Sequence, residues 1–286
     1  MSEPKHHHYV PRFYLSRFTD SRSKIWVLDK QENKVFPSTP NNIGGQNQFY
    51  RLDELAEHDI DPLEMEKQFA DLEYQVSNIT SNWFQQLTKS EKLEIPEINR
   101  DLMSLFIVTQ LLRTVEAREI LVQFTSAVKK DYDPISDAKN LHATLLWNDD
   151  LVNKMKKRIS DCIWIFGNNR STTPFCTSDH PVLIKSFDNK KWLLGPRIFD
   201  EGMYIVYPLS PTLVMYCKDP KYWEKIRKFE NSISPVEFTD DMVKHENSGQ
   251  IGMSYRFVFS KCNDFDFANE FLTDNEDFKN SRRKRF

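Results

Sequence analysis

The sequence is poor in glycine and contains no long run of apolar residues. Only 7 of its 286 residues are glycine, whereas 28% are charged. This composition argues against a glycine-punctuated α/β sheet and favours a helix-rich globular protein. The longest apolar stretch, near residues 102–112, is interrupted by Ser104, Thr109 and Gln110 and is too short to cross a bilayer. We therefore expect a soluble protein with no membrane partner.

Paired cysteines and a secretion signal are also missing. Cys162, Cys176, Cys217 and Cys262 are scattered along the chain without CxxC spacing, and the N-terminus has no signal-peptide pattern. Structural disulfides belong to oxidising compartments, whereas isolated cysteines are ordinary in the reducing cytosol. The cysteine pattern therefore indicates a cytoplasmic protein.

Positive and negative residues are nearly balanced in number. The common catalytic motifs are absent as well. The net charge of −3 gives no general attraction to nucleic acid, so such a partner needs a local basic patch. The phosphate loop GxxxxGKS/T, the dinucleotide fingerprint GxGxxG, the zinc motif HExxH and the nucleophile motif GxSxG do not occur. We therefore expect no cofactor and no metal.

The N-terminal stretch 5–18 is unusually rich in groups that can do chemistry. It holds three histidines, two arginines and four aromatic residues around Pro11. Proline suits the first turn of a helix, so the sequence predicts a short helix over 11–18 with the histidines at its entrance, where they can point into a cleft. The alternatives are a remnant of a purification tag and a set of solvent-facing histidines.

The string from His7 to Leu15, followed by Phe18, resembles the opening signature HHYVPxFYLxxF of an uncharacterised bacterial family of domains of unknown function. The resemblance runs over most of the chain and implies a role in phage defence, but it implies no established reaction. Its further landmarks are the segment 47–50, an acidic helix around Glu64 and Glu73, Gln110 with Arg113 and Thr114, the segment 177–182, and the segment 208–210.

The hydrophobic pattern predicts helices in the central part of the chain. One begins near Asp61, a second runs from about 96 or 99 to 129, and a third covers 137–159. The third ends in a basic group at 154–158 that suits the helix dipole. In the first helix the acidic residues Glu64, Glu66, Asp71 and Glu73 favour a solvated face. A metal site of Glu64 and Glu73 is the alternative, but nine residues place them on different faces.

Gln110 and Arg113 lie three residues apart on a helix that is apolar nearly all round. An unpaired guanidinium in such a place is too costly to keep. Arg113 therefore needs either a carboxylate, such as Glu116 or another acid, or an anionic ligand. The sequence favours neither reading.

Strands dominate the rest of the chain. A hairpin is predicted at 24–29 and 34–36, a short strand at 47–52, and further strands at 162–166, 175–177, 182–184, 203–207, 212–216 and 256–259. This order predicts an α+β fold in which a helical central segment packs on a mostly antiparallel sheet. We expect one domain over 1–286, made of the signature and hairpin (1–52), a helical segment (61–160), a β-rich segment with helices (161–272) and a charged, disordered tail (273–286).

Asp179 follows a predicted strand and precedes His180 and Pro181, so several polar groups meet at one strand end. An Asx turn is the plain alternative. Histidine, arginine and aspartate together are the parts of a metal-independent phosphodiesterase. The candidate catalytic residues are His7, His8, Arg113 and Asp179. The candidate substrate-binding residues are Arg12, Tyr14, Gln110, Asn247 and Arg256.

The leading hypothesis is an intracellular phage-defence effector that acts as a nuclease or nucleotide phosphodiesterase. The alternative is a non-catalytic sensor or binding module that recognises a phage component or a nucleotide. A hydrolase acting on protein or a small metabolite is a third reading. An enzyme needs a histidine and Asp179 within hydrogen-bond reach across one pocket.

Overall fold

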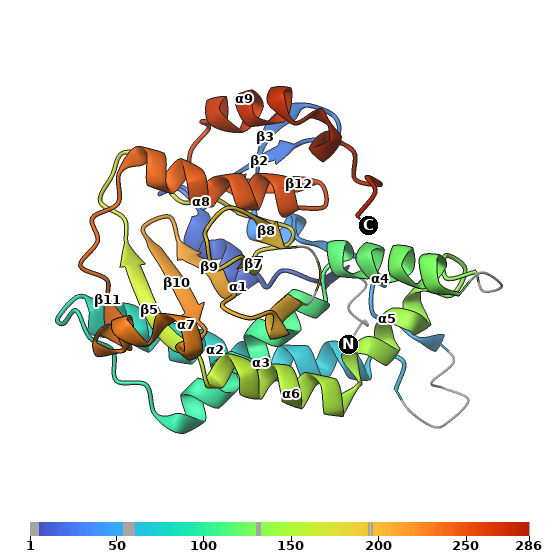
Figure 1. The fold of residues 1–286 in the computed structure, drawn as a ribbon. Coiled ribbons are helices and arrows are strands. Elements are labelled where there is room, and N and C mark those ends of the chain that lie inside the picture. The colour runs from blue at the N-terminus through green and yellow to red at the C-terminus, as the bar shows by residue number, and fades with distance from the viewer. Residues whose placement is uncertain (1–5, 54–60, 130–132, 194, 196, 286) are drawn as a thin grey trace.

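The computed structural model describes residues 6–53, 61–129, 133–193, 195 and 197–285 (Figure 1). Its largest sheet has the strand order β11-β5-β10-β9-β7-β8, in which β11 pairs with β5 in parallel and the other neighbours are antiparallel. The strands are β5 (Ile163–Asn168), β7 (Leu183–Lys185), β8 (Trp192–Leu193), β9 (Tyr204–Ser210), β10 (Leu213–Lys218) and β11 (Ser232–Ile233).

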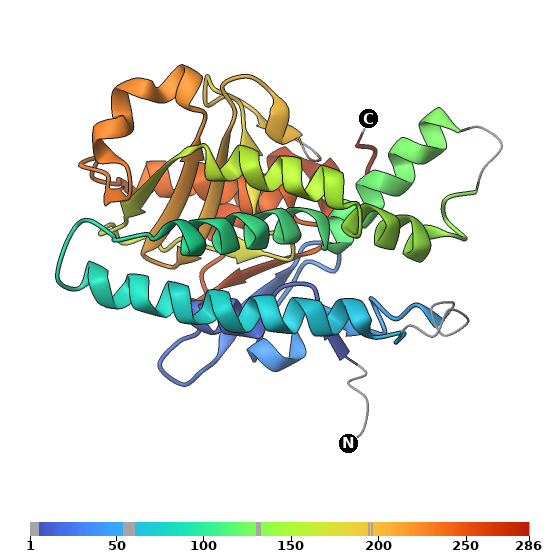
Figure 2. The same cartoon turned by 90° about the horizontal axis from the view of Figure 1, so that it is seen from below.

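Apolar side chains cover both faces of this sheet, because successive residues of a strand point to opposite sides. Ile205 and Tyr207 of β9 join the main core, whereas Tyr204 and Val206 join a separate cluster with Val243. The helices α2 (Glu64–Leu87), α3 (Glu97–Leu112) and α6 (Asp149–Ser160) run side by side over the main core (Figure 2). The helix α8 (Asp240–Met253) supplies Val243 to the other face.

A second sheet joins the two ends of the chain. Its order is β3-β2-β12-β6, with antiparallel neighbours. Leu28 and Val258 on one face pack with Leu272 of the helix α9, whereas Val27 and Phe259 face the main core. The elements are β2 (Ile25–Asp29), β3 (Lys34–Ser38), β6 (Thr177–Ser178), β12 (Phe257–Ser260) and α9 (Asp266–Asp274).

The α+β prediction is confirmed, and so are the N-terminal hairpin and the main strands. The long helices expected at 96–129 and 137–159 are each two helices. The first pair is divided at Thr114, which caps the second helix by accepting a hydrogen bond from the Ala117 amide. The other pair is divided at Asn148, which accepts a hydrogen bond from the Leu151 amide. Such a cap satisfies one of the backbone amides that are left without a partner where a new helix begins. The additional helices are α4 (Val115–Val128) and α5 (Ala138–Leu146).

The N-terminal histidines lie in a strand rather than at a helix entrance. The strand β1 (His6–His8) pairs with β4 (Gly45–Asn47), so the strand expected at 47–52 lies earlier in the chain. The predicted helix follows as α1 (Arg12–Leu15) and the 3-10 helix η1 (Ser16–Phe18). Short helical turns lie at η2 (Pro40–Asn42), η4 (Arg197–Phe199), α7 (Pro220–Trp223) and η5 (Glu224–Phe229).

The C-terminal segment, expected to be a disordered tail, has a defined path in the described residues. It contains the end of α9 and the 3-10 helix η6 (Glu276–Lys279), and it then carries Arg283 and Arg285 into the interior. Both arginines contact Glu116, which provides the charge compensation that the sequence pattern did not reveal. Across the described residues, every helix is too short or too polar to cross a membrane.

Candidate functional site

Arg113 lies at the end of α3 and is fully enclosed. Its Nη1 is 2.8 Å from Glu73 Oε1, and its Nε donates to the Tyr9 carbonyl at 3.0 Å. With the amide of Gln110 oriented so that its oxygen faces the guanidinium, Arg113 Nη2 donates to that oxygen at 2.8 Å. The ion-pair reading of Arg113 therefore describes the structure, with Glu73 as the acid in place of Glu116.

The acidic face of α2 is not simply a solvated face. Glu66 and Glu73 are seven residues apart, which places them on the same side of the helix, and Glu73 reaches inward to Arg113. Burial raises the pKa of Glu66 to about 7, although the nearby positive charge of Arg113 opposes this shift. The seven-residue spacing of Glu66 and Glu73 is the sequence signal that they share one face of the helix, whereas the nine-residue spacing of Glu64 and Glu73 places Glu64 on another face.

His7 is enclosed and joins Arg113 through Tyr50. The Tyr50 amide donates to His7 Nδ1 at 3.1 Å, and the Tyr50 hydroxyl donates to the Arg113 carbonyl at 2.7 Å. The rings of His7 and Tyr50 are stacked, with their centroids 6.1 Å apart. His8 points to the other side of β1, where burial, His6 and Arg12 lower its pKa to about 4.

Asp179 is enclosed by backbone amides. It accepts hydrogen bonds at 2.8 Å from the amides of Tyr255, Arg256 and Phe257. Burial raises its pKa to about 6 against the lowering effect of these bonds. The carboxylate oxygens thus face the start of β12, and among the described residues no hydrogen bond joins them to a histidine.

The remaining predicted residues are mostly structural. Tyr14 donates to the Pro208 carbonyl at 2.7 Å and pairs with the Thr177 hydroxyl. Asn247 joins α8 to the segment before β6, because its amide donates to the Pro174 carbonyl and its oxygen accepts from the Cys176 amide. Arg12 is exposed. The structure does not bring these residues to one site.

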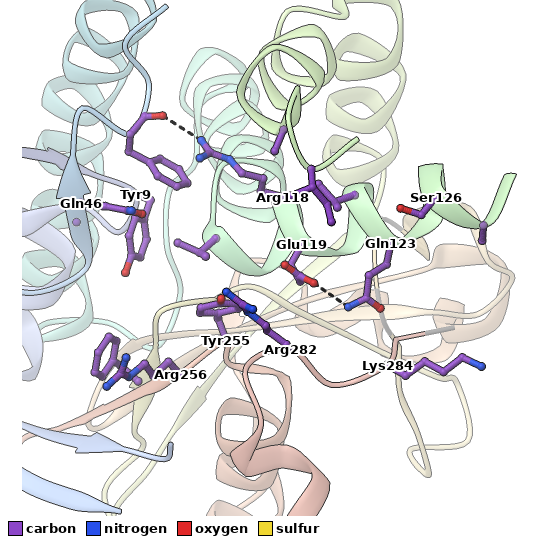
Figure 3. Close-up of a pocket in the computed structure, with 18 residues that line it drawn as sticks. Tyr9, Gln46, Arg118, Glu119, Gln123, Ser126, Tyr255, Arg256, Arg282 and Lys284 are labelled. Carbon is purple, nitrogen blue, oxygen red and sulfur yellow. Dashed lines mark hydrogen bonds between the residues drawn. The ribbon is translucent and has the colours of Figure 1, made fainter. Parts of the chain in front are cut away.

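An open cleft of about 940 Å³ lies elsewhere, between α4, the segment around β4, the start of β12 and the C-terminal segment (Figure 3). Its lining combines four cations with four aromatic rings, and among the described lining residues Glu119 is the one carboxylate. The cations are Arg118, Arg256, Arg282 and Lys284, and the rings belong to Tyr9, Phe49, Tyr255 and Phe257. Of the nine predicted site residues, Arg256 is the one that lines this cleft.

Arg118 is held firmly at the cleft wall. Its Nε donates to His142 Nδ1 at 3.1 Å, its Nη2 donates to the Phe49 carbonyl at 3.0 Å, and its guanidinium lies 3.6 Å from the centroid of the Phe49 ring. Burial lowers its pKa to about 10, so it remains a cation at neutral pH. Arg256 is held in a similar way, because it donates to both carboxylate oxygens of Asp29.

The C-terminal segment supplies the two exposed cations. Ser281, Arg283 and Arg285 are buried, whereas the intervening Arg282 and Lys284 are exposed and line the cleft. This alternation is that of an extended chain. Arg285 contacts both carboxylate oxygens of Glu116, at 2.9 and 2.6 Å, and Arg283 contacts one at 2.9 Å. The ion pairs of Arg283 and Arg285 with Glu116 therefore fix the direction in which Arg282 and Lys284 point.

The enclosed network and the cleft are connected through the backbone. Asp179 fixes the amides of the three consecutive residues Tyr255 to Phe257, all of which line the cleft. Arg113 fixes the carbonyl of Tyr9, whose ring lines the cleft as well. Arg113 and Asp179, two of the residues proposed as catalytic from the sequence, thus help to position the walls of the cleft.

The family model for proteins of unknown function called DUF4238 matches residues 6–264, and the chain belongs to this family. No match to the chain was found among curated proteins or among solved structures. Within the described residues, no three His, Cys, Asp or Glu side chains are grouped so that they can hold a metal ion.

Proposed function

We propose that this protein is a binding module for a nucleotide or a short single-stranded nucleic acid, and that the ligand lies in the cleft of Figure 3. The observation that carries the proposal is the gathering of four cations and four aromatic rings around one cleft in a chain whose net charge is −3. Cations that follow a phosphate backbone, together with rings on which bases stack, are the usual means of binding single strands.

Arg282 and Lys284 are suited to phosphate. Both side chains are exposed, yet the segment that carries them is anchored by the buried Arg283 and Arg285. Binding therefore requires little ordering of the segment itself, which lowers the entropic cost of the complex. Arg118 and Arg256 add fixed positive charge to the other walls.

Two of the aromatic residues are suited to bases. Tyr255 and Phe257, at the start of β12, are partly exposed in the cleft, whereas Tyr9 and Phe49 are buried in its wall. Stacking of a base on an aromatic ring contributes about 1–3 kcal/mol. Gln46 lies beside Tyr9 in the cleft (Figure 3), and its amide can both donate to and accept from the polar edge of a base.

The binding module is favoured over a nuclease or phosphodiesterase because the side chains of His7, Arg113 and Asp179 are enclosed in the network described above. Asp179 is bonded to three amides, and Arg113 pairs with Glu73. The resemblance to a phage-defence family supports a role of this binding in sensing infection, and that role is part of the proposal.

The test is fluorescence anisotropy with labelled 12-residue single strands of RNA and DNA, and competition by mononucleotides. Replacing both Arg282 and Lys284 with Ala should weaken binding about tenfold or more and reduce the salt slope by roughly 1.4, since each phosphate contact on a single strand contributes about 0.7. Displacement of the strand by mononucleotides at similar concentration would identify the nucleotide as the ligand.

The matched control replaces Lys154 and Lys157 with Ala. Both are exposed and lie on α6, where they pair with Asp150 and Asp161. The control removes the same charge from another face, so its affinity should equal that of the wild type. Equal losses in both variants would indicate nonspecific attraction and contradict the proposed cleft.

A further inference from the structure

A second cavity lies on the opposite side of α4 from the cleft. Its volume is about 470 Å³ and its lining is mostly apolar, with Leu112, Ala117, Leu121, Phe124, Leu145 and Phe199 among its walls. Ala117, Leu121 and Phe124 follow a helical spacing, whereas the cleft is lined by Arg118, Val122 and Ser126 of the same helix. One helix therefore separates two cavities of different character.

One buried polar side chain, His180, faces this apolar cavity. The ring is 8% exposed and lines the cavity, and its Nδ1 lies 2.7 Å from the Thr114 hydroxyl. The described residues provide no hydrogen-bond partner for its Nε2. A ring nitrogen at a cavity wall that has no partner in the protein is available to a ligand or to water.

The hydrogen bonds around Thr114 are compatible with a proton on His180 Nε2. The Thr114 oxygen already accepts from the Ala117 amide at 3.2 Å, so its own hydrogen is free to point at His180 Nδ1. In that arrangement the Thr114 hydroxyl donates to Nδ1 and accepts from the Ala117 amide, and the proton of the neutral His180 ring is on Nε2. His180 then acts as a hydrogen-bond donor toward the cavity.

We propose that this cavity binds a small, uncharged and largely apolar molecule that presents one carbonyl or hydroxyl oxygen to His180 Nε2. Its size and lining are those of typical small-molecule sites, which are mostly apolar with a few placed polar groups. The charged residues at the cavity, Arg197 and Asp200, form an ion pair with each other, which leaves no net charge to attract an ionised ligand. The site is independent of the nucleotide-binding proposal.

The test uses two probes of nearly equal shape, 2-acetylnaphthalene and 2-ethylnaphthalene, titrated by calorimetry or ligand-observed NMR against the full chain. The acetyl compound should bind about 2- to 12-fold more tightly, which corresponds to the net value of one hydrogen bond. His180→Phe should remove this difference while both probes still bind. The charged 2-naphthoate should bind more weakly than either.

Two tryptophan variants on α4 locate the site. Leu121→Trp fills the cavity and should abolish binding of both probes, whereas Val122→Trp, which faces the cleft, should leave it unchanged. Equal affinities of the two probes for the wild type, binding that survives Leu121→Trp, or no binding of either probe would each overturn the proposal. The Arg282→Ala, Lys284→Ala double variant should bind both probes normally, so failure of one proposal is distinguishable from failure of the other.

Discussion

The enclosed network around Arg113 and Asp179 and the open cleft beside it use the same residue types for different purposes. In the network, charged side chains bond to backbone groups and to each other, and Arg113 and Asp179 are buried. In the cleft, cations and the partly exposed rings of Tyr255 and Phe257 line an open volume. The comparison teaches that residues which are conspicuous in the sequence can serve mainly to hold the backbone, while the ligand meets less conspicuous neighbours.

Breaking the ion pair of Arg113 should have the largest effect on folding. Arg113→Met leaves Glu73 in a partly enclosed site without its partner, and we expect a loss of about 3–5 kcal/mol in the free energy of unfolding. Urea denaturation followed by tryptophan fluorescence measures it. The added change Glu73→Gln should recover part of the loss, and strict additivity of the two changes would show that they do not interact.

Removing the Asp179 carboxylate should cost about 3 kcal/mol, since Asp179→Ala leaves three backbone amides without their acceptor. Asp179→Asn keeps one acceptor oxygen and should cost less. The same urea experiment distinguishes the two roles of this residue. A fully stable Asp179→Ala protein that loses a nucleolytic activity present in the wild type would favour the catalytic hypothesis instead.

Acidification should destabilise the fold through its buried histidines. Burial lowers the pKa of His142 to about 3 and that of His180 to about 4, so both stay neutral in the folded state while the unfolded chain takes up protons below pH 6.5. Stability therefore rises with pH between about 4 and 6.5. Each histidine contributes roughly 2 kcal/mol between pH 7 and pH 5.

The variant His142→Gln isolates this effect. In the wild type, His142 Nε2 donates to the Leu112 carbonyl and Nδ1 accepts from Arg118, and an amide can provide one donor and one acceptor as well. The stability of the His142→Gln variant should therefore depend less steeply on pH between about 4 and 6.5 than that of the wild type. Glu66 and Asp179 act in the opposite direction because their pKa values are raised, so the difference between variant and wild type is the informative quantity.

The smallest effect on stability is expected at the cleft surface. Arg282→Ala and Lys284→Ala should each change the free energy of unfolding by less than about 0.5 kcal/mol, as surface substitutions generally do. The same changes should have the clear effect on ligand affinity described above. A large loss of stability in either variant would mean that these side chains belong to the folded network and would remove the contrast between the two regions.

Local patterns in the sequence predicted much of the fold. Short runs of β-branched and aromatic residues, such as 203–207 and 212–216, predicted the strands, because these residue types favour a pleated strand. The breaks at Thr114 and Asn148 were missed, although both residues are good N-caps, since apolar residues continue on either side of them. The docked tail was missed because its partner Glu116 is far away in the sequence.

The candidate site was harder to predict for the same reason. Arg113 was recognised as needing a partner, and an Asx turn was the alternative for Asp179. Sequence spacing does not reveal that the partners are Glu73 and the amides of 255–257. The cleft is assembled from four separate parts of the chain, which no local pattern brings together. Its nearest signal in the sequence is the run of four cations over 282–285.

The most direct test of where the ligand binds is photocrosslinking of a 12-residue RNA containing 4-thiouridine, followed by mass spectrometry of the modified peptides. The proposed cleft predicts adducts on peptides that contain Tyr9, Phe49, Tyr255 or Phe257, and their loss in the Arg282→Ala, Lys284→Ala double variant. Adducts confined to α6 or to other faces of the molecule would contradict the account.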